Sequence, residues 1–243
     1  MTINGVLALM IIGSFLVAMA LHELGHTLMR FGLERRRIGK SRLLAWEWQP
    51  RFAVLGALFC IVLAFQPLFP VGLGWGKPRQ VVLEGEQTPV LTRADRALIA
   101  LAGPLSSFIV GALVALGMHF LAPFLLGFDT LVAQRILQTI LVFACVNMSL
   151  ALFNLIPLYP LDGYQVIHAL RSEDAPTGFI KFIGFALIFL LFFFLPFLAQ
   201  LSGGVQFPLF LFPTYILLGA FHLVAAIMHT HTGWYLVNAL YFS

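Results

Sequence analysis

Residues 22–26 read His-Glu-Leu-Gly-His and lie inside an apolar stretch, residues 7–29, that is long enough to span a bilayer. Histidines four positions apart project from one face of a helix, so His22 and His26 can share a zinc ion. Glu23 is then placed to take a proton from a water on that zinc. An ionisable group in a membrane helix costs about 2.5–3.5 kcal/mol. Three such groups within this motif therefore need a compensating ligand.

The composition excludes a soluble globular protein. The chain is 60% hydrophobic and 10% charged, with a mean hydropathy of +0.97, whereas soluble proteins carry about 25% charged residues. We expect an all-α polytopic membrane protein with about six membrane segments, each of about the 20 residues that a hydrocarbon core requires. The expected segments cover residues 7–29, 52–71, 97–121, 131–156, 179–201 and 207–228.

The positive charges predict the orientation of these segments. All but one of the 14 Lys and Arg residues lie at 30–51, at 77–96, and at Arg171 and Lys181. The positive-inside rule makes these regions cytoplasmic and leaves the N-terminus outside. Segment 52–71 has cytoplasmic charge on both sides, so it should dip into the membrane and return, with breaks at Pro67, Pro70 and the nearby glycines. The alternative is an ordinary spanning helix that violates the charge rule.

A catalytic zinc site needs a third protein ligand and keeps a fourth position for water. The candidates in or near the membrane are Asp162, Asp129, His119, His168 and His222. Asp162 is the strongest, because the prolines and glycine around it interrupt a spanning helix near its end and can turn the carboxylate inward. With segment 52–71 re-entrant, Asp162 also reaches the depth of His22 and His26 from the same side. The alternative is that Asp162 only caps a helix.

These residues resemble the site-2 protease family of intramembrane zinc metalloproteases. The resemblance extends from residue 21 to residue 167. It depends on His-Glu-Leu-Gly-His at 22–26, Gly-Trp-Gly-Lys-Pro at 74–78, Ala-Gly-Pro at 102–104, and Asn-Leu-Ile-Pro-Leu-Tyr-Pro-Leu-Asp-Gly at 154–163. It implies one Zn²⁺ per chain, held by His22, His26 and Asp162, with Glu23 as general base and Asn154 holding the substrate carbonyl or stabilising the oxyanion.

The resemblance also implies a small β element near the cytoplasmic face, formed by residues 77–82, that pairs with an unwound substrate. A plain loop is the alternative, because Pro78 removes a backbone donor. The chain departs from the family after Ala-Gly-Pro, where it has Ser106-Ser107 and the family often has Asn. Gly103, Ser107 and Gly111 form a row of small residues four apart, which favours tight helix packing there.

The sequence thus predicts an intramembrane zinc endopeptidase that cleaves membrane-spanning segments of other proteins near the cytoplasmic face. We expect one membrane-embedded domain over residues 1–243, with a catalytic core at about 7–170 and additional helices at 179–229, in a bacterial or archaeal plasma membrane. Its partners would be a membrane-spanning substrate and the lipid bilayer, without nucleic acid. Two alternatives remain: a metal-ion transporter that uses the same cluster, and a non-catalytic scaffold that binds helices. A transporter has no evident need for Glu23.

Overall fold

The computed structural model describes residues 4–38, 53–66, 70–76, 91–128, 130–171, 177–201, 212–228 and 234–242. Four helices in these ranges are long and apolar enough to cross a membrane, and they cover Gly5–Arg36, Arg93–Leu125, Leu131–Asn154 and Gly178–Leu198. Two other apolar helices, Val54–Ala64 and Phe212–Ile227, are shorter than the roughly 20 residues that a span requires. The helical class is confirmed, while the predicted count of about six membrane segments is not.

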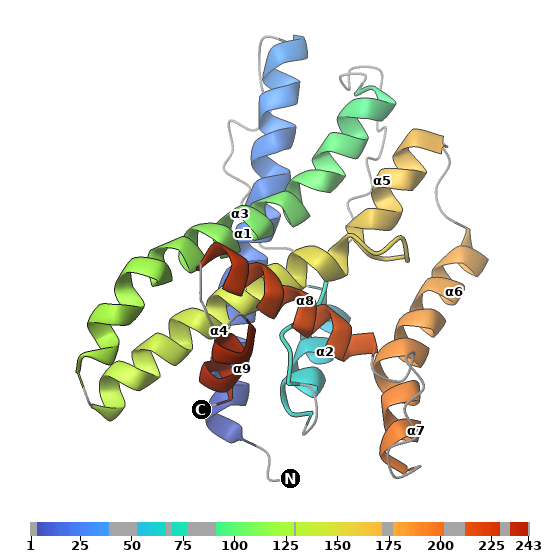
Figure 1. The fold of residues 1–243 in the computed structure, drawn as a ribbon. Coiled ribbons are helices and arrows are strands. Elements are labelled where there is room, and N and C mark those ends of the chain that lie inside the picture. The colour runs from blue at the N-terminus through green and yellow to red at the C-terminus, as the bar shows by residue number, and fades with distance from the viewer. Residues whose placement is uncertain are drawn as a thin grey trace.

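Three helices form the frame of the fold. α1 (Gly5–Ile38) and α3 (Arg93–Leu126) have 34 residues each, which gives a length of about 51 Å. α4 (Leu131–Asn154) returns beside α3 after a short connection, and α1 packs against both (Figure 1). A capping box starts α3: the Thr92 hydroxyl accepts from the Asp95 amide, and the Asp95 carboxylate accepts from the Thr92 amide.

α2 (Val54–Ala64) has only 11 residues, and the chain then turns back. It returns as an extended segment, residues 70–76, whose Val71 amide donates to the Leu63 carbonyl over 3.3 Å. The backbone of Trp75 lies so close to Gly56 that a Cβ there would overlap it. The chain has therefore come back to the first turn of α2, which is the shape of the predicted re-entrant element. Its depth in a membrane stays a prediction, and the predicted β element at 77–82 lies outside the described residues.

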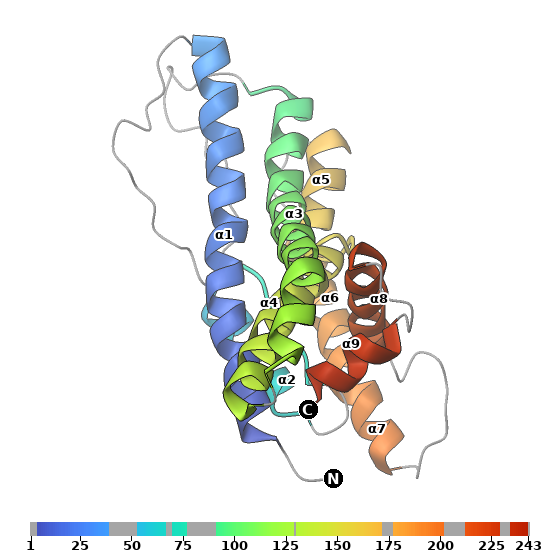
Figure 2. The same ribbon diagram turned by 60° about the vertical axis from the view of Figure 1, so that its left-hand side comes forward.

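A tight loop at 155–161 joins α4 to α5 (Asp162–Arg171). Gly163 packs directly on the end of α4, because a Cβ on it would overlap the carbonyl of Leu155. α5 packs mainly against α3. Figure 2 shows α1, α3 and α5 standing next to one another, so the loop delivers the start of α5 to the side of the bundle where α1 and α3 meet.

The remaining helices either pack on α4 or lie at the periphery of the bundle. α6 (Gly178–Phe189), a π-helical turn η1 (Leu190–Phe194) and α7 (Leu195–Leu201) follow one another along the outside. α8 (Phe212–Ile227) and α9 (Trp234–Tyr241) pack against each other and against α4. Many side chains of α6 and α7 are exposed and apolar, among them Phe179, Phe182, Phe189 and Phe197, as expected of a surface that faces lipid.

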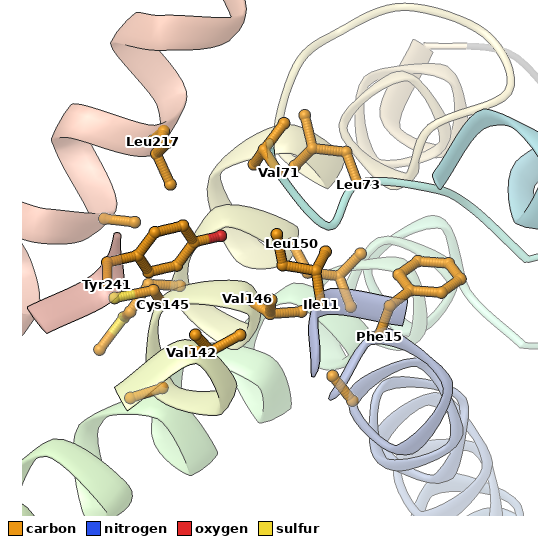
Figure 3. Close-up of a cluster of buried hydrophobic side chains, with 14 of the residues drawn as sticks. Ile11, Phe15, Val71, Leu73, Val142, Cys145, Val146, Leu150, Leu217 and Tyr241 are labelled. Atoms are coloured by element: carbon orange, nitrogen blue, oxygen red, sulfur yellow. The ribbon is translucent and has the colours of Figure 1, made fainter. Parts of the chain in front are cut away.

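The apolar core joins the extended segment to the bundle. Figure 3 shows Val142, Cys145, Val146 and Leu150 of α4 between side chains from α1, from the extended segment, and from the C-terminal helices: Ile11, Phe15, Val71, Leu73, Leu217 and Tyr241. The Tyr241 hydroxyl donates to the Pro70 carbonyl over 3.0 Å. Burial raises the pKa of Tyr241, so this hydroxyl keeps its proton and remains a donor. The C-terminal helix thereby fixes the start of the extended segment.

Candidate metal centre

α1 brings its two histidines together through helix geometry alone. His22 and His26 are one turn apart, and their Nε2 atoms lie 3.3 Å from each other. Both residues are buried, with 1% of His22 exposed. Two imidazoles inside an apolar helix need polar partners, because unpaired buried polar groups cost several kcal/mol in hydrocarbon.

Asp162, the first residue of α5, supplies the partner from 140 positions away in the sequence. Its Oδ2 lies 2.9 Å from His22 Nε2 and 3.4 Å from His26 Nε2. In the part of the chain that the structure describes, these three residues form the one group of three or more His, Cys, Asp or Glu side chains able to hold a metal ion. Asp162 is 17% exposed, so the cluster reaches the surface on the side of α5.

The second ring nitrogen of each histidine also has a partner, and both partners come from α3. His22 Nδ1 lies 3.0 Å from Ser107 Oγ, and His26 Nδ1 lies 2.6 Å from the Ile99 carbonyl. A proton on Nδ1 leaves Nε2 bare, which is the form that binds a metal.

The spacing of the three ligand atoms fits zinc. Zn–N and Zn–O distances of about 2.0–2.1 Å in tetrahedral geometry place neighbouring ligand atoms about 3.3 Å apart. The separations found here are 2.9, 3.3 and 3.4 Å. Gly103 keeps the adjacent volume open, because a Cβ there would overlap Nε2 of both histidines. The donor set and the open volume therefore both fit a catalytic zinc ion.

Glu23 lies next to the cluster, at the end of the extended segment. Its carboxylate is buried, and a Cβ on Gly76 would overlap Glu23 Oε1. Glycine at position 76 is therefore what allows the segment to reach the carboxylate. A general base must be within reach of the proton that it abstracts, and Glu23 shares a helix turn with both histidines.

Asn154, the last residue of α4, contacts the same extended segment. Its Nδ2 donates to the Gly74 carbonyl over 3.2 Å and to the Leu150 carbonyl over 3.0 Å. Both amide protons are thus used, one of them on a backbone carbonyl of an extended chain. That is the kind of partner which a peptide substrate would offer.

The other histidines named as candidate ligands lie elsewhere. His119 Nδ1 lies 2.7 Å from the Met228 carbonyl at the end of α8, and the ring of His168 contacts Tyr164 within α5. His222 belongs to α8 and is not part of the ligand group. Asp129 lies outside the described residues.

Two of the small residues on α3 have a role that the sequence interpretation missed. Gly111 does pack tightly, since a Cβ there would lie 3.1 Å from Met148 Cγ on α4. Ser107 and Gly103, one and two turns earlier, face the histidines of α1 instead. The departure from the family's Asn at position 107 was the signal that could have pointed to this contact.

Comparison with known proteins agrees with the geometry. The model of peptidase family M50 matches residues 119–195, which include Asn154 and Asp162. Rip2 of Mycobacterium tuberculosis, named as a candidate zinc metalloprotease, is 31% identical over 206 residues, covering 83% of this chain and 73% of Rip2. This chain belongs to peptidase family M50. No solved structure matches it significantly.

Two further relatives of this M50 peptidase carry the same kind of name. YwhC of Bacillus subtilis, also named as a candidate zinc metalloprotease, is 28% identical over 186 residues, covering 70% of this chain and 76% of YwhC. The zinc metalloprotease MJ0392 of Methanocaldococcus jannaschii is 32% identical over 83 residues, covering 34% of this chain and 21% of MJ0392. The resemblance to the site-2 proteases is confirmed, and the protein is a zinc-dependent metalloprotease of membranes.

Proposed function

We propose that this protein is an intramembrane endopeptidase that cleaves membrane-spanning segments of substrate proteins near the cytoplasmic face. The observation that carries the proposal is that Asp162 meets His22 and His26 beside Glu23. The two histidines and Glu23 lie on α1, a helix apolar enough to span a bilayer. His26 lies only about 6 Å along the helix from Arg30, by the rise of 1.5 Å per residue. A positively charged side chain at that point favours the cytoplasmic interface, with the N-terminus of α1 outside.

In this proposal His22, His26 and Asp162 hold the zinc ion, and Glu23 is the general base. Zinc, when bound, acts as a Lewis acid that polarises the substrate carbonyl and makes water a better nucleophile. Glu23 accepts the proton of the attacking water and passes it to the leaving amine. Burial of Glu23 beside the imidazoles keeps competing bulk water away from this transfer.

Asn154 acts on the substrate carbonyl. Its amide donates to the Gly74 carbonyl, so a substrate carbonyl must replace that of Gly74 to receive the bond. A donor at a developing oxyanion is typically worth about 3–4 kcal/mol of transition-state stabilisation. A substrate segment must first unwind, because its peptide groups are otherwise bonded within their own helix.

The chain functions as one membrane-embedded domain in this proposal. The helices that carry the ligands all belong to the catalytic core at about 7–170, and the helices at 179–229 are additions around it. The extended segment belongs to the core as well, because it contacts Glu23. The α4–α5 loop also belongs to it, because it leads directly into Asp162 at the start of α5.

A comparison of Glu23→Gln with Glu34→Gln tests the proposal. Both positions are buried carboxylates of α1, but Glu34 is engaged by Arg30 Nε over 2.7 Å, away from the metal cluster. Purified variants and wild type are assayed for bound zinc and for cleavage of single-span substrates in liposomes. We expect equal zinc in all three and loss of cleavage in Glu23→Gln alone. Cleavage by Glu23→Gln at the wild-type rate would refute the proposal.

The same pair of variants separates the protease from a metal-ion transporter. A transporter that uses His22, His26 and Asp162 as a transit site does not need Glu23 to accept a proton. Zinc flux into liposomes that persists in Glu23→Gln, together with no cleavage by wild type, would favour the transporter. Absence of flux together with cleavage by wild type would favour the endopeptidase.

A further inference from the structure

His22 has hydrogen-bonding partners of different kinds at its two ring nitrogens. Nε2 faces Asp162 Oδ2 at 2.9 Å and His26 Nε2 at 3.3 Å, and Nδ1 faces Ser107 Oγ at 3.0 Å. A neutral imidazole carries a single proton, and a metal binds only the nitrogen without it. Zinc can therefore bind Nε2 of His22 only when the ring proton lies on Nδ1, facing Ser107.

His26 has no such choice. Its Nδ1 faces the Ile99 carbonyl at 2.6 Å, and a carbonyl can only accept a hydrogen bond. The proton of a neutral His26 is thus held on Nδ1, and Nε2 is bare. The bare Nε2 of His26 and the carboxylate of Asp162 are then both acceptors facing Nε2 of His22. Before zinc binds, the proton of His22 belongs on Nε2, between these two acceptors.

Ser107 is able to serve both forms of His22, because a hydroxyl both donates and accepts. Its Oγ can donate to a bare Nδ1 when Nε2 carries the proton, and can accept from Nδ1–H when Nε2 binds the metal. Ser107 is 0% exposed, so water does not replace it in either role. Rotation of the hydroxyl proton about the Cβ–Oγ bond of Ser107 is enough to switch it from donor to acceptor.

We propose that Ser107 is a positioning residue of the zinc site: it holds the His22 ring in both tautomers, donating to Nδ1 before zinc binds and accepting from Nδ1–H once Nε2 binds the metal. The proposal rests on the zinc ligands assigned above. It gives a function to the position where the family often has Asn, a side chain that can likewise present an acceptor or a donor. It also replaces the simpler prediction of helix packing for Ser107.

The neighbouring Ser106 offers a matched control. Its hydroxyl also links α3 to α1, since it donates to the Leu21 carbonyl over 3.3 Å and to the Gly103 carbonyl over 2.8 Å. Ser106→Ala removes a bond between the same two helices and leaves the ring of His22 with its partner. Ser107→Ala removes the partner of the ring, whereas Ser107→Thr keeps the hydroxyl.

The experiment measures zinc affinity by competition with a chelator, and the thermal unfolding of the zinc-free protein, for these three variants and for His22→Ala. Loss of a residue that orients a metal ligand typically weakens metal binding 10–100-fold, and we expect a loss of about that size for Ser107→Ala. Ser107→Thr should bind at least 10-fold more tightly than Ser107→Ala, Ser106→Ala should bind zinc as wild type does, and His22→Ala should lose binding. The zinc-free melting temperatures of Ser107→Ala and Ser106→Ala should fall by similar amounts.

The outcomes separate this proposal from the one on which it rests. Wild-type affinity in Ser107→Ala, or an equal loss in Ser106→Ala, would overturn the role of Ser107 while His22→Ala still confirms the ligand. Wild-type affinity in His22→Ala would overturn the zinc site itself. If Ser107→Ala does not fold, the ¹⁵N shifts of the histidine rings in zinc-free wild type decide: we expect the proton on Nε2 of His22 and on Nδ1 of His26, and Nδ1 protonation of both would overturn the proposal.

Discussion

Substitution of Gly103 by alanine is the sharpest test of how the metal site is built. A Cβ at this position would lie 2.5 Å from His22 Nε2 and closer still to His26 Nε2. Ordinary contact begins at 3.4 Å, so the His22 ring would have to retreat by about 0.9 Å. Metal–ligand distances in zinc sites deviate from their typical values by only about 0.2 Å. The substitution therefore displaces the ligand atoms by several times the allowed amount.

Two other glycines of α3 provide controls for Gly103→Ala. Gly111→Ala brings a Cβ to 3.1 Å from Met148 Cγ, which strains the packing of α3 on α4 but touches no ligand. Gly117→Ala meets nothing within 4 Å, and it should stabilise the helix by up to about 1 kcal/mol. The three variants thus separate damage to the metal site from strain in the helix and from a change in helix propensity.

The assay is the zinc content of each purified variant, together with its melting temperature with and without added zinc. We expect Gly103→Ala to bind zinc more than roughly 100-fold more weakly, beyond the range typical of residues that only orient a ligand. We also expect added zinc not to raise its melting temperature. Gly111→Ala and Gly117→Ala should retain zinc. A full complement of zinc in Gly103→Ala would refute the arrangement of ligands around this glycine.

Four further predictions concern the extended segment and the metal. Tyr241→Phe leaves the Pro70 carbonyl without its donor, so we expect a loss of about 1–3 kcal/mol in the free energy of unfolding, measured by denaturant titration in detergent, and an unchanged stability would contradict this role. Gly76→Ala should displace the carboxylate of Glu23 and lower kcat while zinc content stays normal, and a normal kcat would argue against Glu23 as the base. Asn154→Ala should lower kcat about 10²–10³-fold with zinc retained, so loss of zinc in this variant would instead indicate a structural role. Removal of zinc by a chelator should abolish cleavage and lower the melting temperature, because zinc at 100 times its Kd stabilises the folded protein by about 2.7 kcal/mol, and an unchanged melting temperature would contradict tight binding.

The apolar run at 52–71 shows where reasoning from composition is limited. The run is long enough to span a bilayer, but the helix within it ends at Ala64 and the chain comes back beside Gly56. Hydropathy measures how favourably a segment enters lipid, and it does not measure where the helix stops. The charges on both sides of the run predicted a turn back, because they place both of its ends on the same side of the membrane. Pro67 and Pro70 marked where the helix could break.

The proposed metal ligands differ in how much of their geometry is local. His22 and His26 face one another because the helix repeat places residues four apart on one face, so their pairing could be read from the sequence. Asp162 lies far along the chain, and its selection over the other candidate ligands required an argument about membrane depth and a family resemblance. The structure brings its Oδ2 to 2.9 Å from His22 Nε2 through the tight loop at 155–161, after which Gly163 packs on the end of α4.

The sequence by itself determined the membrane class, the all-helical fold, the histidine pair and its neighbouring carboxylate, because each depends on composition or on the repeat of one helix. Only the tertiary structure decided which groups complete the site: Ser107 and the Ile99 carbonyl behind the rings, and Gly103 in front of them. These contacts join α1 to α3 across more than 70 positions of sequence. They arise from the packing of one helix on another, and that packing depends on side chains of the whole bundle at once.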